Sequence, residues 1–446
     1  MTIDLAAPAV VGGLTSRTAS GLTDELAALI RSGALAAGSR LPTIRSVAAA
    51  LGVSVGTVAE VWSALRDQGL VETRRRGGTR VLPSSGARAF GGWGGVDFLL
   101  SSPDTALQPP LEGALLHALR QPGVNAWGRE HMVAALRDAV EPLWPFPAEA
   151  WTSAGGGTEG LWLATRAAVA PGGLLAVEEP APPGYLAAVA EMGVRVVGVP
   201  VDDEGPVPDA LRAALEAGAS ALVHQPGGPF STRHVLSESR IEELVDVLVP
   251  FDAAIVEDDS LGPLSAVPVR TLGNAFPDRT LRVLSYCKAY GLDLRTSVVG
   301  GARTLVDRVV AVRSGGVASN SRILQHALAA MVQDPSAAET VADARAHYAA
   351  RRRLALDAFR DVGLTARSGG GSMSVWVEVH DERTAAQGLA SAGIVADVGA
   401  TAFVTPSARG LLRLSTAQLP EDPALLAELA RLVDRAVRGD LRILFD

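Results

Sequence analysis

Residues 285–295 read Ser285-Tyr-Cys-Lys288-Ala-Tyr-Gly-Leu-Asp-Leu-Arg295, and the prediction of the fold starts from them. This stretch holds the only lysine among 446 residues, whereas the chain has 39 arginines. Arginine keeps its proton in proteins, but lysine becomes an amine nucleophile once burial or nearby cations lower its pKa. A bias toward arginine codons could leave one stray lysine, but it would not explain where Lys288 lies. We therefore expect Lys288 to form a Schiff base with pyridoxal phosphate (PLP).

The acidic residues upstream fit the same chemistry. Residues 253–260, AAIVEDDS, read as a buried strand that ends in acids, and the carboxyl ends of strands are the usual site edge in α/β sheets. Asp258 could keep the pyridine nitrogen of PLP protonated, which makes the ring an electron sink. Arg295 could bind the cofactor phosphate through two N–H groups of its guanidinium, and the hydroxyl of Ser285 could donate a further hydrogen bond. Without the lysine, a solvated loop acid would be an equally good interpretation of Asp258.

Two further features could complete such a site. Residues 152–159, TSAGGGTE, precede a helical period, and glycines at a helix start expose backbone N–H groups to an anion, although a simple tight turn is an equal alternative. Arg413, in the segment RGLLRLS at 409–415, could bind a substrate carboxylate, although a surface salt bridge is the commoner role of an arginine. Cys287 is expected to be a small core residue rather than a nucleophile.

Residues 17–82 predict three helices followed by a β-ribbon, because apolar residues recur at helical spacing before two short extended runs. Thr43 is a plausible N-cap of the second helix, and Gly52 suits the position after its end. The tip of the ribbon, RRRGG at 74–78, carries three arginines at a glycine turn. Two short helices joined by a turn and followed by a basic hairpin indicate a winged helix-turn-helix.

This module is expected to bind double-stranded DNA, with the third helix in the major groove and the ribbon at the minor groove. The expected DNA contacts are Arg45, Ser54, Val55, Gly56, Thr57, Arg74, Arg75, Arg76 and Gly78. The charge distribution agrees, since residues 1–85 carry a net charge of +3 and the remainder −11. The alternative is a helical domain for protein contacts, which would leave three consecutive arginines without a packing purpose.

Length and composition limit the remaining possibilities. A chain of this length is expected to form two or three domains, and its 48% hydrophobic and 20% charged residues are typical of a globular protein. One cysteine excludes an intrachain disulfide and a cysteine-based zinc site. No apolar run is long enough for a membrane span or a signal peptide, so we expect a cytoplasmic protein. The expected divisions are a tail at 1–14, the winged helix-turn-helix at 15–83, a linker at 84–97 and a large α/β domain at 98–446.

The first module resembles the GntR family of bacterial regulators over residues 30–81, IRSGALAAGSRLPTIRSVAAALGVSVGTVAEVWSALRDQGLVETRRRGGTRV. Val55 departs from it, because the family often has a basic residue there. Residues 98–446 resemble a fold type I aminotransferase domain. The whole chain is similar to the MocR branch of the GntR family, which implies a dimeric transcription regulator whose body binds PLP and senses an amino compound or PLP itself.

The resemblance also implies roles for individual residues of the body. Lys288 matches the Schiff-base lysine, and Asp258 matches the partner of the pyridine nitrogen. Arg413 matches the arginine that binds the carboxylate of a substrate or effector. The residues expected to contact PLP are Lys288, Asp258, Arg295, Ser285, Gly157, Thr158 and Ser260.

The chain departs from the family pattern around the cofactor ring. Ser260 stands where a tyrosine is frequent, two residues after the partner of the pyridine nitrogen. Pro182 stands where a tyrosine stacks on the ring, and Tyr185 lies one turn further along. Because an aromatic contact contributes on the order of 1 kcal/mol, we expect weaker PLP binding.

A third departure concerns the ring hydroxyl. The Asn-Pro-Thr-Gly stretch of the family reads GPFS at 228–231, so the asparagine that contacts the hydroxyl is missing. His224 or Gln225 would have to replace it. The residues that anchor PLP are therefore retained, while those that tune its ring are reduced.

Three functions remain open on this basis. The favoured one is a regulator whose PLP-binding body controls DNA binding, with little or no transaminase turnover. The second is a working aminotransferase with an accessory DNA-binding module. The third is a regulator whose altered pocket binds another metabolite without PLP. Transaminase turnover separates the first two, and the absorbance of bound PLP separates the first from the third.

Overall fold

The computed structural model divides the chain into two compact units, residues 1–92 and 93–446. The division falls within the predicted linker, most of which lies outside the described residues, and the predicted domain bounds stay a prediction. The structure describes residues 14, 16–31, 35, 39–67, 70–74, 78–81, 93, 96–99, 101–125, 130–232, 236–268, 270–315, 320–407 and 409–440.

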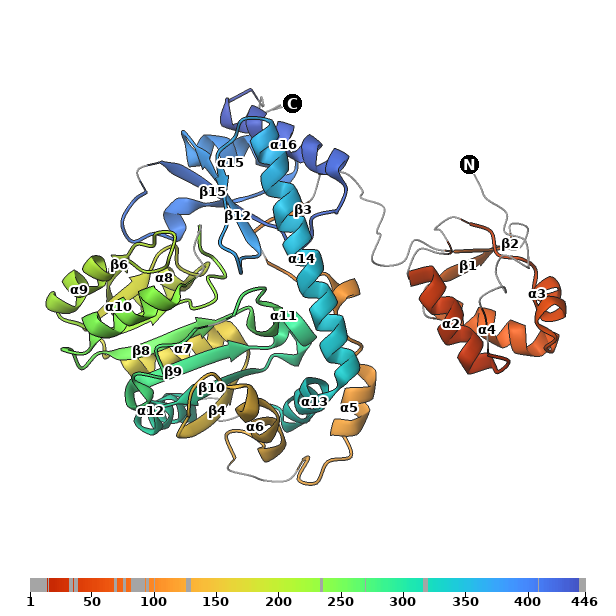
Figure 1. Cartoon of the computed structure of the whole chain (residues 1–446), viewed down its shortest axis with the longest axis horizontal. Helices are drawn as coiled ribbons and strands as arrows, with labels where there is room; N and C mark the ends of the chain where they lie inside the picture. Colours follow the sequence, from red (N-terminus) through yellow and green to blue (C-terminus); the bar gives the residue numbers. More distant parts are fainter. Residues whose placement is uncertain are drawn as a thin grey trace. The chain divides into compact units, whose positions relative to one another are not determined.

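The first unit is the predicted winged helix-turn-helix (Figure 1). Its elements are α2 (Ala19–Arg31), α3 (Ile44–Leu51), α4 (Val55–Asp67), β1 (Val71–Arg74) and β2 (Gly78–Val81). Leu26, Val61 and Leu65 are at most 1% exposed and lie in one apolar core. This core explains the helical spacing of apolar residues in the sequence.

Local hydrogen bonds set the ends of the helices, as the sequence predicts. The side chain of Thr43 accepts a hydrogen bond from the backbone N–H of Ser46 at 3.2 Å and so caps α3. Gly52 ends α3 with φ 68°, a left-handed conformation that favours glycine. Ser54 accepts from the N–H of Thr57 at 2.9 Å and caps α4. The two helices consequently meet at a bend of 120°.

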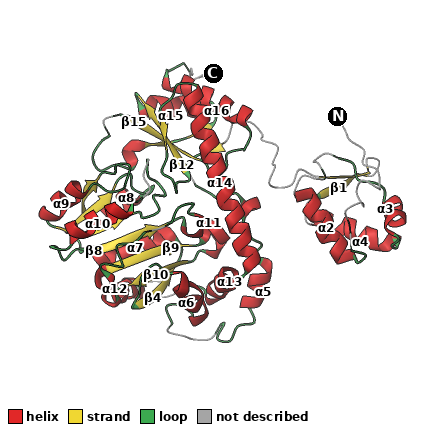
Figure 2. Cartoon of the chain, viewed as in Figure 1, coloured by secondary structure: helices red, strands yellow, loops and turns green. Residues whose placement is uncertain are grey.

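The second unit contains a seven-stranded sheet in the order β4-β10-β9-β8-β7-β5-β6 (Figure 2). Its strands are β4 (Ala150–Ala154), β5 (Leu174–Glu178), β6 (Arg195–Val199), β7 (Ala219–His224), β8 (Ala254–Asp259), β9 (Thr280–Ser285) and β10 (Ser297–Gly301). The strands from β9 to β6 pair in parallel, whereas β10 is antiparallel to both neighbours.

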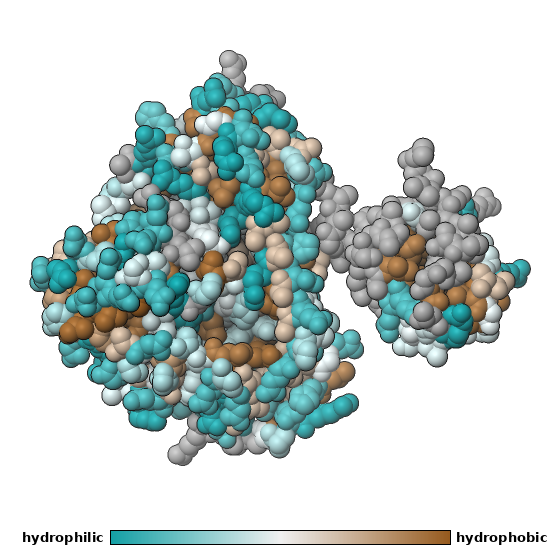
Figure 3. All heavy atoms as spheres, in the orientation of Figure 1, coloured by the Kyte–Doolittle hydropathy of each residue, from teal (hydrophilic) through white to brown (hydrophobic). Residues whose placement is uncertain are grey.

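Helices cover both faces of this sheet, as parallel strands require. They are α7 (Gly157–Ala168), α8 (Tyr185–Glu191), α9 (Pro208–Glu216), α10 (Glu238–Leu248) and α12 (Arg303–Ser314). Leu222 and Ile255 point to the face covered by α9 and α10. Their strand neighbours Val223 and Val256 point to the opposite face, with α7, α8 and α12. Polar residues cover most of the outside of the body on the side drawn in Figure 3.

A smaller antiparallel sheet follows, in the order β11-β12-β15-β14. Its strands are β11 (Ala366–Arg367), β12 (Ser374–Val379), β14 (Asp397–Val398) and β15 (Gly410–Ser415), with α15 (Glu382–Ser391) and α16 (Pro423–Val437) beside them. The 27-residue α14 (Pro335–Asp361) packs on α13 (Arg322–Gln333) and on α16, and so joins the two sheet regions (Figure 1).

The other α-helices and strands of the described residues complete the body. They are β3 (Val96–Asp97), β13 (Ile394–Val395), α5 (Glu112–Ala118), α6 (Ala134–Val140) and α11 (Cys287–Tyr290). β3 pairs in parallel with β13, so the start of this unit contacts its C-terminal part. Within the described residues no single helix is long and apolar enough to span a membrane, and the bent pair α3–α4 reaches that threshold only jointly.

Candidate functional site

The C-terminal ends of the neighbouring strands β8 and β9 bring Asp258 and Lys288 together. Lys288 lies in α11, directly after β9, and Asp258 in β8 is 1% exposed. Neither carboxylate oxygen of Asp258 has a hydrogen-bond partner among the described residues. Burial raises the pKa of Asp258 to about 7, and Lys288 partly offsets this rise. Burial also lowers the pKa of Lys288, which favours its neutral, nucleophilic form.

Successive side chains of β8 point to opposite faces of the sheet, and this separates its three acids. Glu257 and Asp259 point to the face opposite Asp258, where the guanidinium of Arg282 in β9 contacts their carboxylates at 2.8 and 2.6 Å. Those two acids therefore share one cation and have their partners within the protein. Of the three acids of β8, only Asp258 has carboxylate oxygens without a partner among the described residues, so a buried cationic or N–H group is the partner that this position suits.

The glycine turn lies against the segment that carries the lysine. Gly157 begins α7, and a Cβ atom there would lie 3.0 Å from the Cβ of Ser285 and 3.2 Å from its hydroxyl oxygen. Gly156 has φ 106°, and the hydroxyl of Ser297 donates to its carbonyl at 2.9 Å. The free N–H groups of a helix start thus adjoin a hydroxyl, which suits a phosphate group. Thr158, the next residue, is exposed.

Other predicted phosphate and ring contacts also have unused hydrogen-bonding groups. Arg295 is exposed and forms no ion pair with a described residue, while its carbonyl accepts from Asn320 at 3.3 Å. The hydroxyl of Ser260 is buried without a partner in the described part of the chain. One acid also lies at this end of α7, since the carboxylate of Glu159 accepts a hydrogen bond from the N–H of Gly155.

The two arginines of the C-terminal segment differ. Arg409 is 75% exposed at its side chain and pairs with Glu378 at 3.1 Å, as a surface salt bridge. Arg413 is 1% exposed in β15 and pairs with Asp397 at 2.9 Å. Arg413 therefore lies in the interior of the body, with an acid already beside it.

His224 and Gln225, the two candidates for the missing asparagine, lie on different sides of the sheet. The ring of His224 approaches Glu257 at 3.5 Å, on the face away from Asp258. Gln225 follows β7, and its backbone N–H donates to the carboxylate of Glu178 at 2.8 Å. The side-chain oxygen of Gln225 is buried and has no partner among the described residues. The amide nitrogen of Gln225 already donates to the carbonyl of Pro180 at 2.9 Å, so only an acceptor atom is left, and the replacement of the asparagine stays a prediction.

Three residues that interact with Lys288, Asp258 or Arg413 were not singled out from the sequence. Glu178 ends β5 and its charge interacts with that of Asp258. The signal was present, because an acid after an apolar strand is the pattern that identified Asp258. Phe230 lies with its ring centre 5.6 Å from the amine of Lys288, and Asp397 pairs with Arg413. Neither had a local signal, since both act through contacts between distant segments.

Glu178 predicts a pH dependence of stability. Burial, with a smaller contribution from Asp258, raises its pKa from 4.5 to about 8. Between these values the folded state keeps the proton and the unfolded state loses it, so the free energy of unfolding falls as pH rises, by up to about 1.4 kcal/mol per pH unit. Glu178→Gln should flatten this slope. Urea unfolding from pH 5 to 8 measures it, and equal slopes for both proteins would contradict the assignment.

The predicted DNA contacts lie at two places in the first unit. Arg45, Ser54 and Gly56 are exposed, and Val55 is 52% exposed at the first turn of α4. The hydroxyls of Ser54 and Thr57 hydrogen-bond at 2.8 Å. These residues form a polar surface with one apolar group at the start of the helix.

The wing is described only in part. Gly78 begins β2 with φ 73°, and a Cβ there would lie 2.6 Å from the Nε of Arg40. Arg40 is exposed, so it adds a cation beside the wing that the sequence did not single out. Arg75, Arg76 and the side chain of Arg74 lie outside the described residues.

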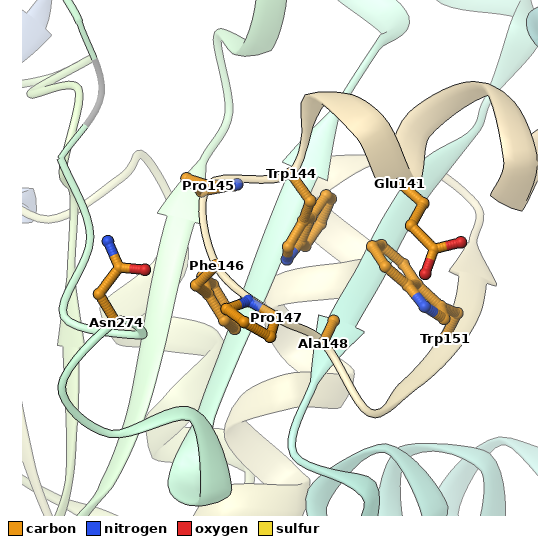
Figure 4. A pocket seen from close by; sticks show the side chains of 8 residues that line it. All are labelled: Glu141, Trp144, Pro145, Phe146, Pro147, Ala148, Trp151 and Asn274. Atoms are coloured by element: carbon orange, nitrogen blue, oxygen red, sulfur yellow. The ribbon is translucent and has the colours of Figure 1, made fainter.

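A surface hollow of about 430 Å³ lies elsewhere on the body (Figure 4). Trp144, Phe146 and Trp151 line it together with Glu141 and Asn274. Trp151 lies in the first half of β4, whereas the glycine turn follows the end of that strand. The hollow is consequently separate from the site at Lys288.

The residues around Lys288 fit pyridoxal phosphate. An amine, a buried acid with unused oxygens and a helix start beside a hydroxyl match its aldehyde, its ring nitrogen and its phosphate in turn. The strongest of these observations is that the carboxylate of Asp258 has no partner in the described part of the chain, because an acid buried without a partner destabilises the fold unless a ligand supplies one.

Comparison with known proteins agrees with both units. The family "Bacterial regulatory proteins, gntR family" matches residues 18–81, and "Aminotransferase class I and II" matches residues 103–431. The vitamin B6 salvage pathway transcriptional repressor PtsJ of Salmonella typhimurium is 26% identical over 440 residues, 95% of this chain and 100% of that protein. The pyridoxine biosynthesis regulator PdxR of Corynebacterium glutamicum is 26% identical, over 76% of this chain and 78% of its own.

A solved structure supports the fold of the body. The kynurenine aminotransferase of Pyrococcus horikoshii has a TM-score of 0.69 at 16% identity, covering 78% of this chain and 91% of its own. The resemblance to a winged helix-turn-helix joined to a fold type I aminotransferase domain is therefore confirmed. The roles of the individual site residues stay predictions.

Proposed function

The chain belongs to the aminotransferase class I and II family and carries a GntR-type DNA-binding unit at residues 18–81, called the head below. On this premise we propose that it is a transcription regulator whose second unit, the body at residues 93–446, binds PLP through Lys288. PLP, or an amino compound that binds beside it, controls how the head binds DNA. The observation that carries this proposal is the buried carboxylate of Asp258, which has no partner among the described residues and lies beside the only lysine of the chain. Both relatives named above are regulators of vitamin B6 genes, which favours PLP itself as the effector.

Each part of the cofactor has a proposed partner in the body. Lys288 is the point of covalent attachment, and Asp258 holds a proton on the ring nitrogen, where PLP supplies an electron sink. Gly157, Thr158 and Ser285 hold the phosphate at the start of α7, and Arg295 adds a cation there. Ser260 lies one residue after β8, with a hydroxyl that can donate to the same ligand.

The proposed role is sensing rather than turnover. Tyr185 is buried, and its hydroxyl hydrogen-bonds that of Thr165 at 2.7 Å, so it is held by α7. Pro182 cannot stack as a tyrosine would. A ring with fewer contacts is held less firmly for the proton transfers of transamination, which need its electronics and a substrate clamp together.

We further propose that the protein works as a homodimer in the cytoplasm. Arg295 is exposed in the single chain, and Leu292 beside it is 44% exposed. A second copy over this surface would shield the phosphate site from water. A dimer would also present two heads to the two halves of a palindromic operator.

The test measures DNA affinity with and without PLP. A binding site is selected from random duplexes, and fluorescence anisotropy then gives its affinity for the full chain. We expect saturating PLP to change the affinity by about fivefold or more, within the usual range of coupling between two sites. Arg75→Ala/Arg76→Ala should bind DNA about tenfold more weakly with or without PLP and should flatten the salt dependence.

The control is Arg66→Ala, which removes an exposed cation at the other end of α4 and should retain most of the affinity. Equal DNA affinity with and without PLP, in protein shown to hold the cofactor, would contradict regulation by PLP. Unchanged binding of the double variant would show that the wing does not contact DNA.

A further inference from the structure

Each nitrogen of the Arg413 guanidinium already donates a hydrogen bond inside the protein. Nη2 and Nε donate to one carboxylate oxygen of Asp397 at 2.9 and 3.2 Å. Nη2 also donates to the carbonyl of Leu99 at 2.6 Å, and Nη1 to the hydroxyl of Ser374 at 3.4 Å. An arginine binds a ligand carboxylate through two neighbouring N–H groups. Here the Nε–Nη2 edge faces an internal acid, and both N–H groups of Nη2 are already used by Asp397 and Leu99, which also occupies half of the Nη1–Nη2 edge.

Asp397 is held in this position by the sheet. It lies in β14 directly opposite Arg413 in β15. Its second carboxylate oxygen accepts from the N–H of Val398 at 3.0 Å and from the hydroxyl of Thr401 at 3.3 Å. The acid cannot swing away without losing these bonds. A second carboxylate at Arg413 would therefore lie beside a fixed negative charge in the interior, which is strongly unfavourable.

The ring of Phe230 lies close to both the lysine and the arginine. Its centre lies 5.6 Å from the amine of Lys288 and 5.9 Å from the central carbon of the Arg413 guanidinium. The residue is 6% exposed, and its carbonyl accepts a hydrogen bond from the indole N–H of Trp376 at 2.9 Å. A ligand beside Lys288 thus has an apolar ring close to it, and the same ring lies close to Arg413.

We propose that the pocket beside Lys288 accepts amines that lack a carboxylate on the carbon bearing the nitrogen, and that Asp397 sets this preference by neutralising Arg413. The inference deepens the proposed function and rests on it, because it specifies which amino compounds reach the PLP site. Asp397 is a specificity-determining residue here, and Phe230 supports it by placing apolar surface close to both Lys288 and Arg413.

Two ligands that differ by one carboxylate test the proposal. They are N-(5′-phosphopyridoxyl)-L-leucine and the same conjugate of isopentylamine, the amine that leucine becomes without its carboxylate. Neither has an aldehyde to react with Lys288, so calorimetric titration of the cofactor-free full chain measures their binding alone. We expect the amine conjugate to bind about tenfold more tightly or better, because it leaves no carboxylate beside Asp397.

Asp397→Asn should shift the affinity ratio toward the leucine conjugate by about tenfold or more, since it frees the charge of Arg413 while keeping a polar side chain of the same shape. Adding Arg413→Gln should abolish the shift. Asp138→Asn, which removes an exposed carboxylate, is the matched control and should keep the wild-type ratio. Phe230→Ala is a second variant, with a smaller shift in the same direction.

Two results would overturn the inference alone: tighter wild-type binding of the leucine conjugate, or an unchanged ratio in folded Asp397→Asn. If neither conjugate binds the wild-type protein or any variant, the PLP site of the proposed function fails and the inference falls with it. The two failures are therefore distinguishable by whether the amine conjugate binds at all.

Discussion

Lys288→Ala should lose all covalently attached PLP, while the wild-type chain should carry about one cofactor per polypeptide after borohydride reduction. The expectation is unusually sharp because the chain has no other lysine, so no second side-chain amine can form a trapped product. Burial lowers the pKa of Lys288, which increases its neutral fraction and hence its reactivity. Mass spectrometry of the intact protein and of its peptides measures the attachment.

The matched control is Lys288→Arg, which keeps a cation beside Asp258 but has no nucleophilic amine at physiological pH. It should also show no trapped cofactor and no absorbance band of the attached form. Both variants should retain weak, reversible PLP binding through the start of α7 and Ser285. A wild-type peptide 285–295 that stays unmodified after reduction in excess PLP would refute the role of Lys288.

Arg282→Met should lower the free energy of unfolding by about 3–5 kcal/mol, because it removes the cation that two buried acids share. Arg282 is 2% exposed and contacts Glu257 at 2.8 Å and Asp259 at 2.6 Å. Methionine fills a similar volume, so the loss reports mainly the two uncompensated carboxylates. Urea unfolding of the full chain at neutral pH, followed by circular dichroism, measures the effect.

Two controls separate charge from packing in this experiment. Adding Glu257→Gln and Asp259→Asn to Arg282→Met should recover much of the loss, since no buried charge then remains without a partner. Arg137→Ala breaks a pair whose side chains are 49% and 59% exposed, and it should cost under about 1 kcal/mol. A loss in Arg282→Met no larger than in Arg137→Ala would show that the buried acids are not held by this arginine.

The first unit was the more predictable part of the fold. The caps Thr43 and Gly52 bond to residues three or four positions away, so a short window of sequence contains both partners. The apolar spacing of its helices likewise depends only on the period of the helix. The body was predictable as alternating helices and strands, and its single lysine after an acidic strand end indicated the cofactor class.

Lys288 and Asp258 could be predicted from the sequence, whereas the residues that surround them could not. Lys288 and Asp258 were identified from residue type and position, and the structure brings them to adjacent strand ends. Gln225 and His224 could not be separated from the sequence, because the contact of His224 with Glu257 and that of Gln225 with Pro180 both depend on tertiary packing. Glu178 carried the same pattern as Asp258, but only the strand order places its charge near that acid.

Residue identity and local spacing thus established a unique amine, an acid at a strand end and a basic DNA-binding head. The partners of Arg413 were decided only by the tertiary structure, because Leu99 lies 314 residues away from Arg413 in the sequence and Asp397 lies 16 residues away. Helix periods and caps act within a few residues, whereas the pairing of buried charges depends on the order and register of strands. That long-range pairing turns the arginine expected to attract a carboxylate into one already neutralised.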